Sequence, residues 1–391
     1  MKKILVIAYY FPPAAGVGTF RIAKFVKYLP LFGWEPVILT VKEKYYKNKD
    51  NSLISDFSKK IKIYRTDIMN FPINNADIKW LPFLFKDFRK VIKKEKPNLL
   101  YFTGGPFFQW RLAPFFKRKY NIPYIIDFRD PWFLDPYEKE KSILRKNISE
   151  FLKKKWELLI IKNADKVIFA TTNMEKIYRK EYNFYKEKFL SIENGYDPDD
   201  YKNVPPKKNS NFSIVYTGKF AHYRDPKNFF KALGKLKNII DFQFMHIGEK
   251  EKKIEKIIKK ERIEKKSLLV GLKTYKETIS HSKGADVLVL ITGKSKLEST
   301  QKVFDYVACD KPIIAITNKN SAVARVLKNF KKAFVIDDNP EIIKDAIIKI
   351  YKDKTNNVSF GDQKIMLDYN RKFLTKKLAE CLDRVVIPDN H

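Results

Sequence analysis

Cysteine, histidine and long apolar runs are scarce in this sequence of 391 residues. Its two cysteines, Cys309 and Cys381, are too few for a disulfide framework and lack the spacing of metal ligands. Its four histidines show no ligand spacing either. These absences argue against a disulfide-stapled secreted domain and against a zinc site, and they predict a protein of the reducing cytoplasm.

The apolar runs fall well short of the ~20 residues that a membrane-spanning helix needs. The N-terminal stretch MKKILVIAYYFPP has lysines and a short apolar run, but Pro12 and Pro13 interrupt it before the core of a signal peptide is complete. We therefore interpret this stretch as a first strand. Any contact with a membrane is expected to be peripheral.

Acidic residues are also under-represented, because 45 Asp and Glu stand against 79 Lys and Arg, a formal net charge of +34. Such an excess suits nucleic acid, an anionic membrane surface or a polyanionic substrate. The chain is rich in Lys, Ile, Asn, Phe and Tyr together, as AT-rich coding would give, so we attribute roughly half of the excess to that bias. Since no nucleic-acid-binding motif is present, specific binding of nucleic acid is the least favoured alternative.

Short apolar runs alternate with longer helical patterns along the chain, which is typical of parallel βαβ units. Strands are predicted at residues 3–10, 35–41, 60–66, 98–103, 123–128, 166–171, 189–194, 212–218, 242–248, 267–272, 286–292, 312–317 and 333–337. A chain of this length favours two domains. The predicted fold class is α/β, with two Rossmann-like doubly wound domains that face each other across a cleft, where such sheets bind ligands.

Changes in composition predict the domain boundaries. The first domain covers residues 1–198, and a polar linker with prolines follows at 199–211. The second domain covers residues 212–362. Residues 363–391 form a C-terminal amphipathic helix and tail, and we expect this helix to cross back to the first domain.

Two glycines, Gly16 and Gly18, follow the first predicted strand in the stretch YYFPPAAGVGTFR. Glycines at this place let backbone N–H groups and a helix N-terminus approach an anion, and Thr19 is the predicted N-cap of that helix. The match to a dinucleotide fingerprint is poor, because Arg21 stands where the third glycine is expected. A structural role in a tight turn is the alternative for both glycines.

Charged residues end a buried strand in the stretch IIDFRDPW, which contains Asp127, Arg129 and Asp130. Buried charges are costly unless they are paired or used. One interpretation is a structural ion pair; in the other, a carboxylate serves as a base or binds an acceptor while the arginine orients it. Gly104 and Gly105 in TGGPFF follow the preceding strand and are predicted to line the same edge.

Three cations, Lys219, Arg224 and Lys227, follow the first strand of the second domain. As a group they suit a diphosphate. The stretch LESTQKVFDYVACDKPIIA predicts a helix that is capped by Ser299 or Thr300 and offers free N–H groups to a phosphate.

Two carboxylates belong to the same stretch. Glu298 and Asp305 are two helical turns apart, so they could share a face and bind sugar hydroxyls.

With these residues in place, the chain resembles the nucleotide-sugar glycosyltransferases of the GT-B fold, and in particular family 4 of the retaining enzymes. The resemblance covers nearly the whole chain and rests on five motifs in order: FPPAAGVGTFR, DFRDPW, ENGYD, YTG with the cations after it, and KVFDYVACDKPIIA. Two departures stand out. Asp305 replaces the family's glutamate, and the family spacing puts the first glutamate at Leu297, whereas the carboxylate is at Glu298.

The resemblance implies a sugar donor linked to UDP, GDP or dTDP, with no cofactor and no metal. It implies that Lys219 and Lys227 neutralise the leaving diphosphate and that Asp305 holds the nucleotide ribose. Asp130 is expected to bind the acceptor or handle its proton. The residues expected at the donor are Gly16, Gly18, Lys219, Arg224, Lys227, Glu298, Thr300 and Asp305. Those expected at the acceptor are Arg21, Gly104, Gly105, Asp127, Arg129 and Asp130.

The activity implied is transfer of a sugar to a hydroxyl acceptor, with retention of configuration, in envelope or surface-polysaccharide assembly. A GT-B nucleotide-sugar epimerase is the alternative. It would need carboxylates and a histidine around one sugar, and the scarcity of histidine argues against it.

The segment 139–166 combines apolar positions at helical spacing with clustered lysines, the pattern of an interfacial helix on anionic lipid. On this interpretation the acceptor is a lipid-linked glycan and the protein lies peripherally on the inner face of the cell membrane. The alternative is that the same apolar stripe packs on the sheet while the lysines are solvated.

Overall fold

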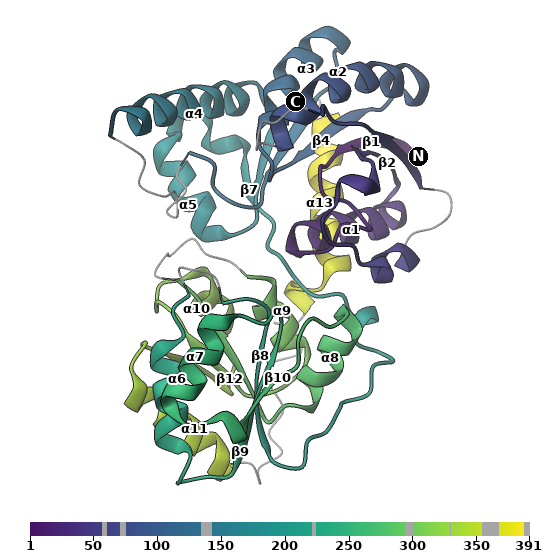
Figure 1. Cartoon of the computed structure of the whole chain (residues 1–391). Coiled ribbons are helices and arrows are strands. Elements are labelled where there is room, and N and C mark those ends of the chain that lie inside the picture. The colour runs from purple at the N-terminus through teal and green to yellow at the C-terminus, as the bar shows by residue number, and fades with distance from the viewer. Residues whose placement is uncertain are drawn as a thin grey trace. The chain divides into compact units, whose positions relative to one another are not determined.

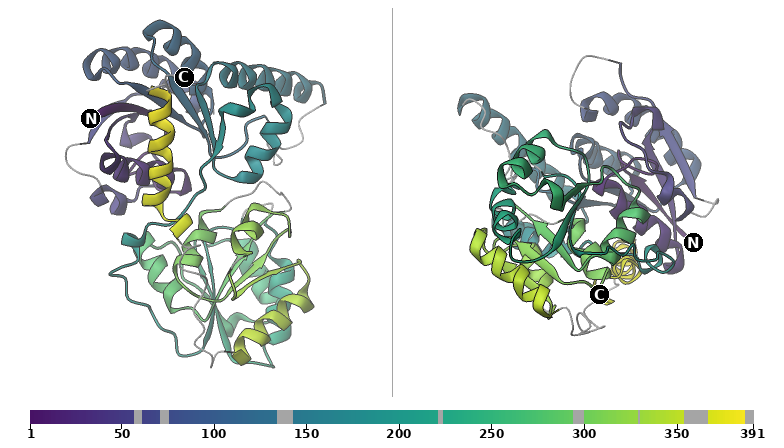
Figure 2. Two further views of the ribbon diagram at one scale, coloured as in Figure 1. Left: turned by 180° about the vertical axis from the view of Figure 1, so that it is seen from behind. Right: turned by 60° about the horizontal axis from the view of Figure 1, so that its bottom comes forward.

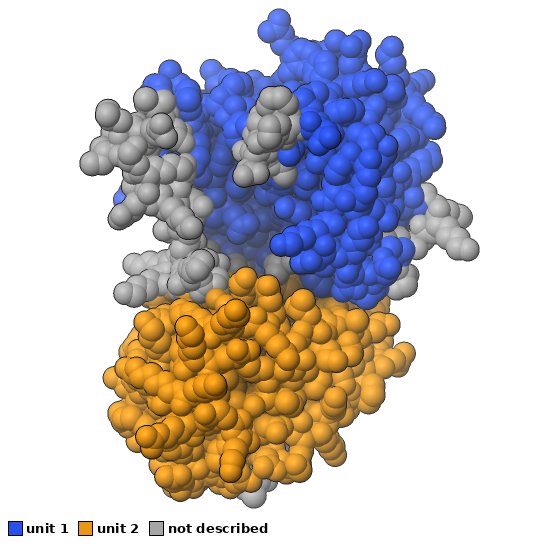
Figure 3. Space-filling model, viewed as in Figure 1, with its two compact units in different colours: residues 1–194, 371–391 blue, residues 195–370 orange. Residues whose placement is uncertain are grey.

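The computed structural model describes residues 1–56, 61–70, 76–133, 143–220, 224–293, 300–328, 330–353 and 367–386. The chain divides into two compact units (Figure 3). Unit 1 comprises residues Met1–Asn194 and Arg371–His391, and unit 2 comprises Gly195–Asn370. Glu298 lies outside the described residues.

Unit 1 is built on a seven-stranded parallel sheet with the order β3-β2-β1-β4-β5-β6-β7. Its strands are β1 (Lys2–Ile7), β2 (Trp34–Val41), β3 (Lys62–Thr66), β4 (Leu99–Thr103), β5 (Tyr124–Phe128), β6 (Lys166–Phe169) and β7 (Phe189–Ser191). The order reverses between β1 and β4, the kind of switch point beside which open α/β sheets bind ligands.

Helices cover both faces of this sheet (Figure 1). They are α1 (Val17–Tyr28), α2 (Ala76–Glu95), α3 (Ala113–Tyr120), α4 (Ile143–Asn163), α5 (Thr172–Glu181) and α13 (Arg371–Val386). Helices α1 and α13 share one apolar core with the sheet, and α2 to α5 share the other. Because both faces of the sheet are covered, its central strands are nearly continuous apolar runs, which is why the sequence predicts them well. The edge strand β3 is less buried.

The C-terminal helix α13 packs beside α1, which confirms that it crosses back to the first half of the chain (Figure 2). Leu374, Leu378 and Leu382 recur on its buried face. Asp383 Oδ1 accepts hydrogen bonds from Trp34 Nε1 at 3.1 Å and from Lys2 Nζ at 2.5 Å. Unit 1 therefore depends on residues from both ends of the chain.

Unit 2 has a six-stranded parallel sheet with the order β10-β9-β8-β11-β12-β13. Its strands are β8 (Phe212–Thr217), β9 (Phe242–Ile247), β10 (Ser267–Leu269), β11 (Val287–Ile291), β12 (Ile313–Ile316) and β13 (Ala333–Ile336). Its helices are α6 (Lys227–Leu236), α7 (Lys252–Glu261), α8 (Tyr275–Gly284), α9 (Gln301–Ala308), α10 (Ala322–Leu327) and α11 (Pro340–Lys352). Helices α6, α7 and α11 share a core on one face, and α8 to α10 share a core on the other.

Two local expectations differ from the structure. Helix α1 begins at Val17 after the N-cap Gly16, so Thr19 lies inside the helix and is not its cap. Gly16 takes a positive φ of 115°, and the helix N-cap lies three residues before the predicted Thr19.

The segment expected to be the linker, residues 199–211, lies within unit 2 and contacts helix α8. Ser280 Oγ donates to the carbonyl of Pro205 at 2.7 Å, and Lys207 N donates to the carbonyl of Ser280 at 2.9 Å. The polar residues and prolines therefore mark a surface segment of unit 2. Two of its backbone groups, the carbonyl of Pro205 and the N–H of Lys207, form hydrogen bonds with α8.

Candidate functional site

A buried ion pair lies at the carboxyl end of the sheet of unit 1. Arg21 of α1 and Asp127 of β5 are 2% and 0% exposed. Arg21 Nη2 donates to Asp127 Oδ1 at 2.8 Å, and Arg21 Nε lies 3.0 Å from Oδ2. The contact is the two-point fork typical of arginine and carboxylate.

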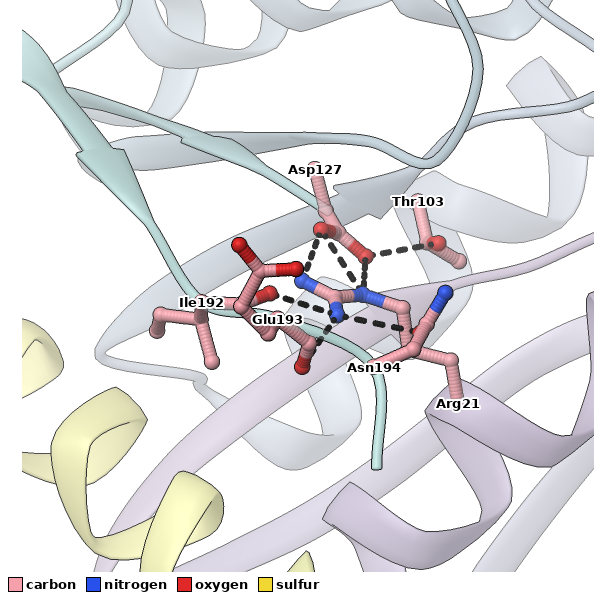
Figure 4. A network of polar contacts seen from close by, with 6 residues as sticks. All are labelled: Arg21, Thr103, Asp127, Ile192, Glu193 and Asn194. Carbon is pink, nitrogen blue, oxygen red and sulfur yellow. Dashed lines mark hydrogen bonds and ion pairs between the residues drawn. The ribbon is translucent and has the colours of Figure 1, made fainter. Parts of the chain in front are cut away.

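Neighbouring groups complete this network (Figure 4). Thr103, opposite Asp127 in the β4–β5 register, donates its hydroxyl to Oδ2 at 3.1 Å. Arg21 Nη1 donates to the carbonyls of Ile192 and Glu193, at 2.8 and 3.2 Å. The pair thus joins α1, β4, β5 and the chain that leaves β7.

This geometry gives Arg21 and Asp127 a structural role, and their expected contact with the acceptor stays a prediction. Both side chains are buried, and each is engaged by the other and by neighbouring groups of unit 1. The structural interpretation of the charged strand end therefore holds for Asp127, and its partner is Arg21.

The position of Arg129 explains why two residues near it, Gly18 and Gly105, lack side chains. Its Nη1 donates to the carbonyl of Gly18 in α1, and its Nη2 donates to the carbonyl of Gly105 in the loop after β4. A Cβ on Gly18 would lie 2.8 Å from Nη1, and one on Gly105 would lie 3.0 Å from Nη2. Both glycines therefore let a guanidinium approach the backbone. The expected approach of Gly18 to a phosphate stays a prediction.

Burial dominates the electrostatics of this guanidinium. Desolvation lowers the pKa of Arg129, although the carboxylates of Asp130 and Asp127 oppose the shift. Gly104 has a different neighbour, since a Cβ there would meet the indole of Trp110 at 2.4 Å. Gly104 and Gly105 shape this loop through packing, which leaves their contact with an acceptor as a prediction.

Two expected residues of unit 1 remain open to solvent at this edge. Asp130 is exposed in the loop after β5, and Gly16 is exposed at the start of α1 with nothing within 4 Å of a Cβ built on it. A substrate could therefore reach both residues.

In unit 2, a glycine turn follows β8 beside a cation that the sequence analysis did not single out. Lys302 Nζ of α9 donates to the hydroxyl of Tyr216 at 3.0 Å and lies 4.1 Å from its ring centroid. A Cβ on Gly218, whose φ is 83°, would lie 2.9 Å from Lys302 Cε. The ammonium group of Lys302 is thus held against the Gly218 turn.

His246 supports this turn from the neighbouring strand β9. Its Nε2 lies 2.8 Å from the carbonyl of Gly218, and the ring is 1% exposed. Burial lowers the pKa of His246, so the neutral ring donates its Nε2–H to this carbonyl. The contact agrees with the position of His246 inside a strand.

The three predicted cations of this region are more peripheral. Lys219 pairs with Glu249 at 3.2 Å and Lys227 pairs with Asp225 at 3.3 Å, and both lysine side chains are at least 60% exposed. Arg224 is half-buried and interacts with Tyr216. Their roles at a diphosphate stay predictions.

The predicted cap of helix α9 is confirmed. Thr300 is the N-cap of α9, and its hydroxyl accepts a hydrogen bond from Lys302 N. The helix ends at Ala308.

Asp305 lies one turn into α9 and is held by three donors. Its Oδ1 accepts hydrogen bonds from the hydroxyls of Tyr201 and Tyr275, both at 3.0 Å, and from Gln301 Nε2 at 3.1 Å. The contacts join α9 to α8 and to the segment before β8. A role for Asp305 at a ribose stays a prediction.

Sequence reasoning missed Lys302 and Glu157. Lys302 stands in the quoted motif KVFDY, but the lysine-rich background hides it. Glu157 lies on α4 and is 0% exposed; no local pattern marks an acid that faces a core.

Among the described residues, no three His, Cys, Asp or Glu side chains gather in a way that could hold a metal ion. Within those same ranges, no helix combines the length and apolar character needed to cross a bilayer.

Family models match both halves of the chain. The model described as "Glycosyl transferases group 1" matches residues 197–366, and the model described as "Glycosyltransferase Family 4" matches residues 20–200. No curated protein sequence matches the chain.

Solved structures share the fold at low identity. A glycosyltransferase from Rickettsia africae is 16% identical with a TM-score of 0.73 over 100% of this chain and 99% of its own. HepE from Anabaena, in complex with UDP, is 12% identical with a TM-score of 0.68 over 98% and 100%. A putative UDP-N-acetylglucosamine 2-epimerase from Listeria monocytogenes is 12% identical with a TM-score of 0.64 over 98% and 96%. Each half of the chain matches a glycosyltransferase family model, and the structure contains two parallel sheets. The chain is therefore a glycosyltransferase of the GT-B fold.

Proposed function

We propose that the enzyme transfers a sugar from a nucleoside-diphosphate sugar to a hydroxyl acceptor, with retention of configuration, in the assembly of a surface polysaccharide. Unit 2 binds the donor in this proposal, and unit 1 binds the acceptor. The match of residues 20–200 to a family 4 model supports the expected class of reaction.

One arrangement in unit 2 carries the proposal. The Gly218 turn after β8, Lys302 and the Thr300-capped start of α9 lie together at the carboxyl end of the sheet. Backbone N–H groups and a half-buried ammonium are what a diphosphate needs as it leaves, because negative charge develops on it in the transition state. The structural likeness to HepE, which was crystallised with UDP, supports a nucleotide at this place.

Calorimetric titration with UDP, GDP and dTDP tests the donor site directly. We expect one of the three to bind in the micromolar range, and its sugar conjugates then identify the donor. Proton NMR of the transfer product reports its anomeric configuration and so tests retention. Failure of all three nucleotides to bind at millimolar concentration would contradict the proposal.

The epimerase remains a second candidate because the Listeria monocytogenes protein shares the fold. If this enzyme is an epimerase, a nucleotide sugar incubated without acceptor should yield its epimer. The transferase predicts slow hydrolysis of the donor under those conditions and transfer once an acceptor is added.

We also propose that unit 1 binds anionic membranes through helix α4. The apolar positions on this helix divide into two sets: Ile160 is buried in the core, whereas Phe151, Leu152, Leu158 and Leu159 are 39% to 58% exposed. Lys155 Nζ lies 4.3 Å from the ring centroid of Phe151. This spacing puts exposed apolar and basic side chains on one face of the helix, as an interfacial helix requires.

Sedimentation with vesicles tests the membrane proposal. The enzyme is expected to sediment with anionic vesicles at low salt and to be released as salt rises, because each basic residue near the surface contributes about 1 kcal/mol that salt screens. Charge reversal at Lys155 and Phe151→Ser should weaken sedimentation, whereas charge reversal at the exposed Lys256 of α7 is the matched control. Equal sedimentation with neutral vesicles would contradict it.

A further inference from the structure

Arg111 of unit 1 has an unusual environment for a guanidinium. It belongs to the 3-10 turn η4 (Phe108–Leu112), which follows the Gly104–Gly105 loop at the carboxyl end of β4. Its Cζ lies 4.1 Å from the ring centroid of Phe108, 4.6 Å from that of Trp156 and 6.0 Å from that of Trp132. We call these three rings the aromatic cage.

The charge of Arg111 is not balanced within the described part of the chain. No carboxylate among those residues pairs with Arg111, and its buried Nε has no hydrogen-bond partner. Desolvation is the only cause that shifts the pKa of Arg111, and it lowers it. Glu157, beside Trp156, is engaged elsewhere, because its carboxylate accepts hydrogen bonds from Phe133 N, Tyr178 and Tyr182.

Ring faces attract a guanidinium, but they do not replace the hydrogen bonds that its N–H groups made with water. A half-buried arginine with unused donors is therefore poorly satisfied until an anion arrives. The planar fork of N–H groups fits the oxygens of a phosphoryl group, which it can grip at two points.

The cage lies beside the loop expected to meet the acceptor. Trp132 comes two residues after Asp130, and its ring stacks on Phe107 of the loop after β4 at a centroid distance of 5.7 Å. We infer that Arg111 and the aromatic cage form a binding site for a phosphoryl group, carried either by the acceptor molecule or by a lipid surface on which the acceptor is presented. This inference deepens the proposed function, since it gives the acceptor or its surroundings a negative charge.

Binding of simple phosphates to the intact enzyme, without donor, tests the site. All five tryptophans lie in unit 1, and two of them form the cage, so tryptophan fluorescence reports on this unit. We expect saturable fluorescence changes with methyl phosphate or methyl diphosphate. Arg111→Met should weaken this binding about tenfold or more, because it removes a two-point charged contact.

Three variants separate the explanations. Arg111→Lys keeps the charge and the ring contact but loses the fork, so a loss of binding in this variant supports phosphoryl recognition even if Arg111→Met fails to fold. Arg118→Met makes the same charge change on the exposed face of α3 and should bind like the wild type. Lys302→Met should also keep this binding, since Lys302 belongs to unit 2.

The outcomes are distinguishable. Binding of the soluble phosphates assigns the group to the acceptor, whereas Arg111-dependent binding only to phosphatidylglycerol vesicles assigns it to the lipid surface. The inference is overturned if Arg111→Met and Arg111→Lys bind both probes like the wild type, or if the wild type binds neither. Loss of binding in Lys302→Met alone would place the anion in unit 2 and overturn it as well. Failure of UDP, GDP and dTDP to bind would contradict the proposed donor site without affecting this result.

Discussion

Arg21 and Asp127, 106 positions apart in the chain, form a buried two-point ion pair with 2.8 Å between Nη2 and Oδ1. Removing one charge would leave the other buried without its partner, so we expect Asp127→Asn to lower the free energy of unfolding of unit 1 by about 3 to 5 kcal/mol. Urea unfolding followed by tryptophan fluorescence measures this, because all five tryptophans lie in unit 1. Asp87→Asn, which breaks the surface pair with Lys90, is the control and should cost less than about 1 kcal/mol. Equal effects would show that the buried pair contributes nothing special.

Gly18 and Arg129 should behave as a coupled pair. We expect Gly18→Ala to cost about 1 to 3 kcal/mol of stability, because its Cβ would lie 2.8 Å from a guanidinium nitrogen that has little room to move. In an Arg129→Met background the same change should cost much less, since the clash is gone. A double-mutant cycle by urea unfolding measures the coupling. Additive effects would show that Gly18 matters for another reason.

Glu157 predicts a stability that depends on pH. Desolvation raises its pKa from 4.5 to about 7, opposed by hydrogen bonds from Phe133 N, Tyr182 and Tyr178 and aided by Glu181. Between these two pH values the folded protein holds a proton that the unfolded chain has lost. The contribution of Glu157 to the free energy of unfolding therefore falls as pH rises through this window, by about 3 kcal/mol in total, and is constant above it.

Glu157→Gln removes this titration. Between pH 5 and pH 8, the free energy of unfolding of the wild type should therefore fall relative to that of the variant. Tryptophan-monitored urea unfolding at both pH values measures the shift, and the exposed Glu187→Gln should show none. Identical pH dependence in Glu157→Gln and the wild type would refute the raised pKa.

The contribution of each lysine of unit 2 to nucleotide binding should increase with its burial. We expect Lys302→Met to weaken binding of the preferred nucleoside diphosphate by about 1.5 to 3 kcal/mol, because Lys302 is held against the Gly218 turn. Lys227→Met should have a smaller effect, since Lys227 is 63% exposed and paired with Asp225. Calorimetry of both variants decides the order. The reverse order would restore the family-based assignment of Lys227 as the main contact.

The sequence by itself determined the elements and their class. Each predicted strand is present. The central strands stand out in the sequence because strands buried on both faces are continuous apolar runs. The cap Thr300 was also predictable, since capping is a local relation between a side chain and the N–H groups just after it.

Only the tertiary structure decided which partner each polar residue has. Nothing in the spacing of Arg21 and Asp127 indicates that they pair, nor that Arg129 requires Gly18 and Gly105 to lack side chains. The apolar stripe of α4 was visible in the sequence, but its division into the buried Ile160 and the exposed Phe151 was not. Such contacts join segments that are distant in the chain, so they depend on sheet order and helix packing, whereas local sequence patterns report only on near neighbours.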